Sequence, residues 1–133
     1  MEEALRAKLL ATAALTELVG ARVDWGVRSQ GATLPAVVLH LSADVPTMNL
    51  DKPGAWSSAR VAIDCWGRTH KAARDVANVI ARPAGEGGLH GLRDVLSTIK
   101  FRTWVLGRDS DSDTDAQAVI HRTRLDLRVW YQL

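Results

Sequence analysis

The sequence is poor in cysteine, in long apolar runs and in net charge, and each shortage excludes a class of protein. Cys65 is the only cysteine, which excludes an internal disulfide and fits a reducing compartment. No run approaches the roughly 18 apolar residues that a membrane-spanning helix needs, so we expect no membrane partner. The start is acidic, with Glu2 and Glu3, where a signal peptide would be basic. A formal charge of +2 does not by itself indicate nucleic-acid binding.

The motifs of common catalytic and metal-binding sites are also missing. The sequence contains no HExxH, CxxC or GxSxG, and its four histidines lack metal-like spacing. The glycine-rich stretch 83–91 follows a predicted helix and has no GK[ST], which argues against a phosphate site. The acidic stretch 109–115 has Thr114 and Ile120 where a calcium loop needs Gly and Glu. We therefore expect no enzyme, no catalytic residue, no metal site and no cofactor.

The stretch 60–82 changes its hydrophobic period once, at Gly67. Before Gly67 the apolar residues alternate, as in a half-buried strand, with Cys65 expected in the core. After Gly67 they recur at helical spacing, from Thr69 as the N-cap to Pro83 as the stop. The strand residues on the inner side are Val61, Ile63 and Cys65, and the helix residues are Ala73, Val76, Ala77 and Ile80. A strand, a turn and a helix are predicted at the centre of the fold.

The other elements are predicted on both sides of this unit. A helix is expected over 2–19, a strand over 36–42, a helical turn within 89–96, and strands over 97–106 and 119–133. The stretches 21–34 and 107–118 are predicted as loops, the first with one short strand over 22–25. Together they predict one α+β domain over 1–133, with a mainly antiparallel sheet of about four to five strands, an extended β-hairpin and two packed helices.

Contact surfaces are expected at the edges of this domain. The stretch 44–58 contains Pro53-Gly54, a turn signal, and predicts a projecting hairpin with Met48, Leu50 and Trp56 on exposed arms. A mobile surface loop is the alternative. The outward residues Arg60, Asp64 and Trp66 are further candidates for subunit contact, and Asp64 is also expected to form a cross-strand ion pair. The last strand presents a basic face, and the loop before it is acidic, so the two are predicted to meet across subunits; their residues are Arg122, Arg124, Arg128, Asp109 and Asp111.

The order of elements carries a family resemblance. The segments VAIDCWGRTHKAARDVANVI and RTRLDLRVWYQL, with LRAKLLATAALTELVGARVDWG and LPAVVLHLSA, resemble the tail-completion (tail-terminator) proteins of long-tailed bacteriophages and of phage-derived particles such as prophages and gene transfer agents. The resemblance implies a structural subunit of a homo-hexameric ring that caps the tail tube, ends its polymerisation and joins the tail to the head connector.

The implied partners are the tail-tube protein, the head–tail connector or stopper protein, and DNA that passes through the channel without sequence readout. The implied location is the head–tail junction of the virion, after synthesis in the bacterial host cytoplasm. Two alternatives remain open: another neck component, such as a head-completion or stopper protein, and a small DNA-binding module that uses the basic last strand. The aspartates at 109–115 argue against the second alternative.

Overall fold

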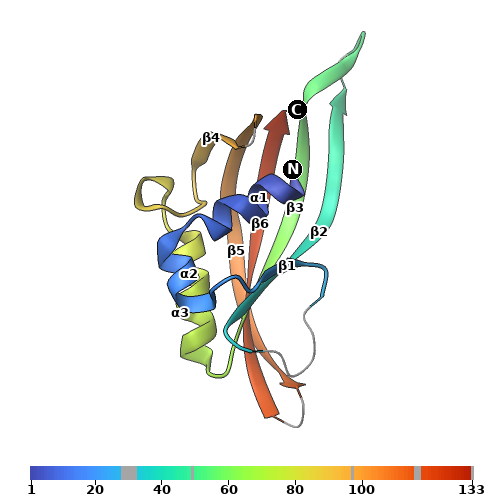
Figure 1. Ribbon diagram of the computed structural model, residues 1–133. Coiled ribbons are helices and arrows are strands. Elements are labelled where there is room, and N and C mark those ends of the chain that lie inside the picture. The colour runs from blue at the N-terminus through green and yellow to red at the C-terminus, as the bar shows by residue number, and fades with distance from the viewer. Residues whose placement is uncertain (28–32, 49, 97, 116–117, 133) are drawn as a thin grey trace.

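The computed structural model describes residues 1–27, 33–48, 50–96, 98–115 and 118–132. Two helices and a short strand come first, followed by a long hairpin, a third helix and three more strands (Figure 1). The elements are α1 (Glu2–Leu10), α2 (Ala13–Val19), β1 (Val23–Trp25), β2 (Ala36–Met48), β3 (Pro53–Gly67), α3 (His70–Ala81), a 3-10 turn (Ala84–Glu86), β4 (Leu92–Leu96), β5 (Ile99–Asp115) and β6 (Ala118–Gln132). None of the helices in these described ranges is long and apolar enough to cross a membrane.

The sheet has six strands in the order β1-β2-β3-β6-β5-β4. Neighbouring strands in the sheet are antiparallel, except β1 and β2, which are parallel to each other. The predicted α+β class is confirmed, but the described chain has six strands where four or five were expected, and three α-helices where two were expected. The β2–β3 and β5–β6 hairpins extend at opposite ends of the molecule (Figure 1).

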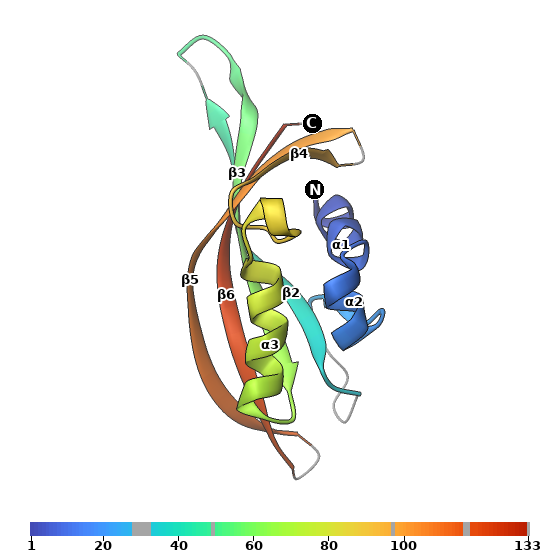
Figure 2. The same cartoon turned by 90° about the vertical axis from the view of Figure 1, so that its left-hand side faces the viewer.

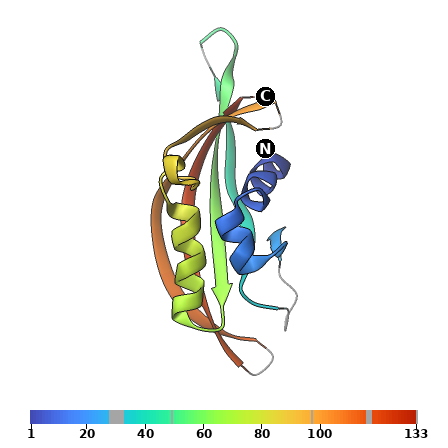
Figure 3. The same cartoon turned by 60° about the vertical axis from the view of Figure 1, so that its left-hand side comes forward.

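All three helices lie on one side of the sheet, which curves around them (Figures 2 and 3). The alternation predicted for β3 places Val61, Ile63 and Cys65 on this side, where all three are fully buried. Leu125 and Leu127 of β6 lie directly opposite Ile63 and Val61. Burying an aliphatic side chain of this size contributes about 1.5 to 3 kcal/mol, so this paired row is a main source of stability.

The turn from β3 into α3 follows the prediction closely. Thr69 Oγ1 accepts a hydrogen bond from the Ala72 amide at 3.0 Å, and α3 ends at Ala81, two residues before Pro83. The predicted inner face of α3 is confirmed, since its four apolar residues are buried. A Cβ on Gly67 would lie only 2.6 Å from the Ala73 amide nitrogen, so the tight passage from strand to helix requires glycine there.

The single helix predicted over 2–19 is wrong, because the chain breaks at Ala11 and Thr12 into α1 and α2. Thr12 is extended, with φ −85° and ψ 104°, and its hydroxyl donates to the Lys8 carbonyl at 3.0 Å. A threonine hydroxyl can satisfy a backbone carbonyl at a helix end, which stabilises the break. The apolar residues keep their helical spacing on both sides of the break, so the spacing did not reveal it. Arg6 Nε also donates to the Val23 carbonyl at 2.7 Å, which ties α1 to β1.

Two stretches predicted as turns or loops are strands. Residues 92–96 form β4 on the sheet edge, and β5 continues through 107–115 as part of a long hairpin. Asp and Ser are poor strand formers, but β5 pairs in register with β6, whose arginines face the aspartates. Cross-strand pairing therefore outweighs local propensity. Residues 116–117 of the predicted acidic loop, and 28–32 of the predicted loop 21–34, lie outside the described residues.

Candidate interaction surface

The side of the sheet that faces away from the helices, here called the open face, is covered by no helix of the described chain (Figure 2). The alternate residues of β3 and β6 point to it, as the alternation predicted. Residues directly opposite each other on antiparallel strands share a face, so the register adds residues of β5. The described members used below are Trp56, Arg60, Asp64, Trp66, Arg102, Trp104, Asp109, Asp111, Arg122, Arg124, Asp126, Arg128 and Trp130.

Asp64 is the centre of an ion-pair network on the open face. Its carboxylate accepts from Arg124 Nε at 2.6 Å and from Arg124 Nη2 at 3.0 Å. His40 Nε2 lies 3.1 Å from Asp64 Oδ2, and Arg122 Nη1 lies 3.6 Å from the same atom. The hydrogen bond to Asp64 raises the pKa of Arg124 above its ordinary value. The cross-strand ion pair predicted for Asp64 is thus confirmed, with Arg124 as its partner.

Asp64 is, however, only 2% exposed, which corrects its assignment as an outward contact residue. The strand alternation places it on the open face, but neighbouring side chains cover it. Its carboxylate is therefore used inside the subunit, and it holds β2, β3 and β6 in register. Arg60 of the same row remains exposed and pairs with Asp126 of β6.

Of the acidic and basic residues predicted to meet across subunits, Arg122 and Asp111 meet within this one. Arg122 Nε donates to Asp111 at 2.9 Å, and a second, shorter contact joins Arg122 Nη2 to the same carboxylate. Asp109 lies directly opposite Arg124 in the β5–β6 register. The cause is simple: the acidic segment is a strand beside the basic strand, so opposite charges of the same chain lie next to each other.

The middle of the open face is hollow because its residues are small. Ala62 of β3 and Gly107 of β5 both face Asp126 in register. A hollow of about 570 Å³ opens there, with Arg60, Asp109 and other charged side chains at its margin. Because Arg60 already pairs with Asp126, this hollow offers few unsatisfied charges to a partner.

The β2–β3 hairpin projects beyond the body of the molecule, as predicted (Figure 1). Strand β2 runs to Met48 and β3 starts at Pro53, with register shifts after Leu41 and after Pro46, so most of the hairpin is paired strand, unlike the mobile loop that was the alternative. Met48 is 73% exposed and Leu50 is fully exposed. A Cβ on Gly54 would lie 2.1 Å from Thr47 Oγ1, so the arms approach each other too closely for any other residue.

Hydrogen bonds from two hydroxyl groups also stiffen this hairpin. The Tyr131 hydroxyl donates to both oxygens of the Asp44 carboxylate at 2.8 Å, and Thr47 Oγ1 donates to the Trp56 carbonyl at 2.5 Å. Burial, and after it the bond to Asp44, raises the pKa of Tyr131. The apolar residues of the tip are thus held out on a braced arm.

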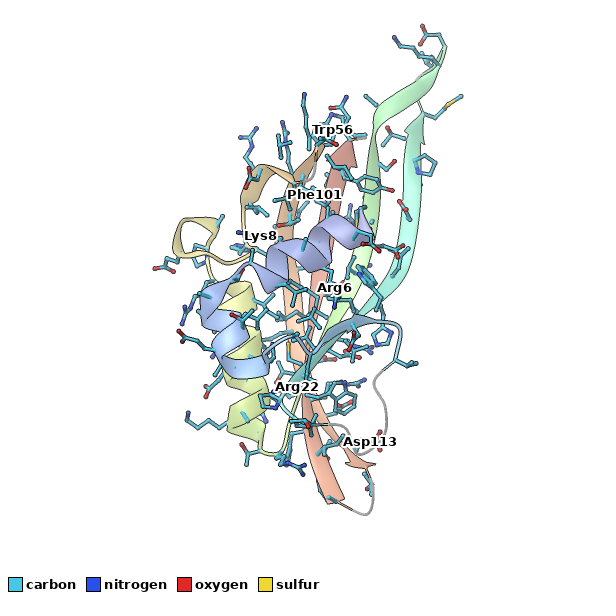
Figure 4. All side chains as sticks on the ribbon, in the orientation of Figure 1. Arg6, Lys8, Arg22, Trp56, Phe101 and Asp113 are labelled. Atoms are coloured by element: carbon cyan, nitrogen blue, oxygen red, sulfur yellow. The ribbon has the colours of Figure 1, made fainter. Side chains whose placement is uncertain are left out.

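Trp56 does not lie on an exposed arm, as the sequence suggested, but is half-buried where the hairpin leaves the sheet (Figure 4). With Trp104, Trp130 and Arg102 it lines a hollow of about 350 Å³, here called the Trp hollow. The Arg102 guanidinium lies 5.0 Å from the centre of the Trp56 ring, within range of a cation–π contact. The Trp hollow and the acidic segment are at opposite ends of the sheet, as the labels of Trp56 and Asp113 show (Figure 4).

Arg128 lies beside the Trp hollow, opposite Trp104 and Arg60 in the register. Its Nε is buried and has no hydrogen-bond partner among the described residues. Sequence reasoning selected Arg128 for its charge but missed Arg102, Trp104 and Trp130. The signal was present, because both tryptophans fall on the polar side of strictly alternating strands. At the other end of the open face, the Arg122 guanidinium lies 5.5 Å from the centre of the Trp66 ring.

The described residues contain no group of three or more His, Cys, Asp or Glu placed to hold a metal ion. Cys65 is fully buried, and burial raises the pKa of its thiol far above the ordinary value, so it is the core residue that the sequence predicted. What the open face offers is a surface for contact: a charged middle that is paired, a Trp hollow and a projecting apolar arm.

Comparison with known proteins gives a match to the family described as Tail completion protein gp17, over residues 3–132. This match confirms the resemblance seen in the sequence. A solved chain from the virion of a native gene transfer agent (GTA) particle is 21% identical, with a TM-score of 0.70, and the match covers 100% of this chain and 95% of that one. A second solved chain is 14% identical, with a TM-score of 0.53 and coverage of 100% and 96%. At these identities the two solved chains establish the fold. No curated protein matches.

Proposed function

This chain belongs to the tail completion protein gp17 family, which consists of structural phage tail proteins, and on that premise we propose that it is a subunit of a hexameric tail-terminator ring. The ring caps the tail tube, ends its polymerisation and joins the tail to the head connector. The subunit acts as one domain over 1–133. Its site is the head–tail junction of the virion, and DNA passes through the central channel.

The observation that carries this proposal is the projecting β2–β3 hairpin. Met48 and Leu50 are large apolar side chains at its tip, exposed on an arm that the Tyr131–Asp44 and Thr47–Trp56 hydrogen bonds brace. An exposed apolar group on a preorganised arm is costly for a free monomer and typical of a surface that a partner covers. The arm therefore supports a protein that functions in an assembly.

A closed ring needs two different patches on each subunit, because its contacts run head to tail. The hairpin supplies one patch and the open face supplies a second. The arginines Arg122 and Arg124 are already held by Asp111 and Asp64, so they are poorly placed to bind phosphates. This supports DNA passage without sequence readout over the alternative of a DNA-binding module.

The mass of the protein, measured by light scattering alone and mixed with tail-tube protein, tests the proposal. We expect a ring bound to the tube end in the mixture, with the length of the tubes limited when the protein is added. Met48→Asp should abolish ring formation. The matched control Val119→Asp, at an exposed valine outside the β2–β3 hairpin, should leave ring formation intact. A protein that stays monomeric and does not bind the tail-tube protein would overturn the proposal. Binding to the connector but not to the tube would support the stopper alternative in its place.

A further inference from the structure

We infer that the Trp hollow of one copy receives the tip of the β2–β3 hairpin of the next copy. The described residues of that tip are Met48, Leu50, Asp51 and Lys52. The inference rests on the proposed ring and names the contact that builds it. It also assigns a part in assembly to Arg102, Trp104 and Trp130.

The Trp hollow has the chemistry of a receptor for an apolar segment with a hydrogen-bond acceptor. Three tryptophan side chains form its walls, and each is only half-buried. Large aromatic side chains in a concave, partly desolvated place are typical of the most energetic residues of protein interfaces. Arg102 lies at the margin of the hollow and Arg128 lies beside it, and no carboxylate among the described residues pairs with either guanidinium.

The Arg128 Nε makes the need for an acceptor specific. This atom is buried and donates to nothing in the described chain. A buried donor that lacks an acceptor costs free energy. Because this atom is covered within its own subunit, a partner's oxygen removes that cost only when the Arg128 side chain turns toward the hollow. The occupant of the hollow should therefore bring a carboxylate or a main-chain carbonyl together with apolar side chains.

The hairpin tip brings this combination. Met48 and Leu50 are among the most exposed large apolar side chains of the described chain, and Asp51 follows them directly. Lys52 is next in sequence and offsets the charge of Asp51, so the net charge of the tip does not explain why the tip would bind the hollow. The match depends on the Asp51 carboxylate meeting the arginines while the apolar side chains enter the hollow.

The tip cannot enter the hollow of its own subunit. β2 and β3 stay paired up to Met48 and Pro53, with register shifts after Leu41 and after Pro46, so the arm holds its tip beyond the sheet, whereas Trp56 lies where the hairpin leaves the sheet (Figures 1 and 4). Each copy thus has one unfilled hollow and one uncovered tip, which is the pattern of a head-to-tail contact. A series of head-to-tail contacts leaves no hollow unfilled and no tip uncovered only when the series of subunits closes on itself, as in a ring.

Disulfide trapping tests the contact directly. Leu50→Cys copies are mixed with Arg102→Cys copies in the presence of tail-tube protein; the fully buried Cys65 does not compete. We expect crosslinked dimer to exceed, by about tenfold or more, the yield from Leu50→Cys mixed with Val119→Cys, because a specific contact raises the local concentration of the two thiols. Equal yields from the two mixtures would overturn the inference.

Complementation of two defective copies gives an independent readout. Leu50→Asp removes the apolar tip but keeps the hollow, and Arg102→Glu repels Asp51 but keeps the tip. Neither should form rings alone, and the mixture should stop at a heterodimer, since only one good contact remains. Asp51→Asn should weaken assembly by roughly tenfold, while Lys52→Gln should leave it unchanged. If the wild type forms rings and Leu50→Asp forms them equally well, the contact is wrong and the ring stands. If the wild type forms no rings and no crosslink appears, both are wrong.

Discussion

Replacing Asp64 by asparagine tests the most consequential contact inside the subunit. The substitution keeps the shape of the side chain and removes its charge. The new Nδ2 group would face Arg124 Nη2, so a donor would meet a donor where a hydrogen bond of 3.0 Å now exists. Asp64 is 2% exposed, so water cannot readily replace the lost partner on that side.

The cost can be worked out from the contacts. Two charge-assisted hydrogen bonds from Arg124 are at stake, and a bond of this kind contributes a net of about 1.5 to 3 kcal/mol. Removing one partner of a fully buried pair costs about 3 to 5 kcal/mol. The cations here are partly solvated, since the side chain of Arg124 is 39% exposed and that of Arg122 is 23% exposed. We therefore expect Asp64→Asn to lower the free energy of unfolding by about 2 to 3 kcal/mol.

Urea denaturation with a double-mutant cycle provides the measurement. Asp64→Asn combined with Arg124→Gln should show a coupling free energy of about 1 to 2 kcal/mol. The matched control is the exposed pair of Arg60 and Asp126, whose side chains are 47% and 39% exposed and whose coupling should be about 0 to 1 kcal/mol. If Asp64→Asn costs no more than Asp126→Asn, the carboxylate is solvated and its place at the centre of the network is wrong.

Two further predictions concern the two ends of the fold. Thr69→Ala should lower the stability by about 1 kcal/mol in thermal unfolding, because the Ala72 amide loses its cap, while Thr69→Asn should restore most of the loss. Tyr131→Phe should cost about 1 kcal/mol at neutral pH, since Asp44 loses its donor. Because the pKa of Tyr131 is raised in the folded state, its contribution is fully present below the ordinary pKa of about 10 and is lost as the pH rises above it. The stability of the wild type should thus fall more steeply than that of Tyr131→Phe in alkaline solution; parallel curves would contradict this assignment.

The elements that the sequence predicted well are those whose signal is local. The alternation of β3 and β6, the cap at Thr69 and the apolar face of α3 each depend on near neighbours, and each is confirmed. Most of the predictions that were wrong concern partners distant in sequence; the single helix over 2–19 is the exception, because its break at Thr12 is local. Asp109 and Asp111 form part of a strand in which arginines of β6 lie directly opposite them. Composition alone assigns such a segment to a loop.

The Trp hollow shows the same limit for the candidate site. Trp56 and Trp130 are 74 positions apart, yet Ser58 pairs with Trp130 and brings them to one end of the open face. The alternation indicated that Trp104 and Trp130 point away from the core, but only the register brings them next to Trp56. A contact surface built from several strands is therefore recognisable in the sequence as outward residues, and its shape appears only with the strand pairing.

The buried network and the exposed hollow are linked by that pairing. A slip of one residue between β3 and β6 would move Asp64 to the helix side of the sheet, into the apolar core, where an unpaired carboxylate is very costly. A slip of two residues keeps the same side chains on each face, so the alternating pattern alone allows it. The bidentate contact of Asp64 with Arg124 favours the observed register over such slips. The same register sets Ser58 opposite Trp130, six residues farther along β6 than Arg124, and so brings Trp130 close to Trp56. The neighbouring β5–β6 register then adds Arg102 opposite Trp130 and Trp104 opposite Arg128. The stretch that forms the centre of the fold contributes no binding group of its own to the Trp hollow, but it determines where the binding groups meet.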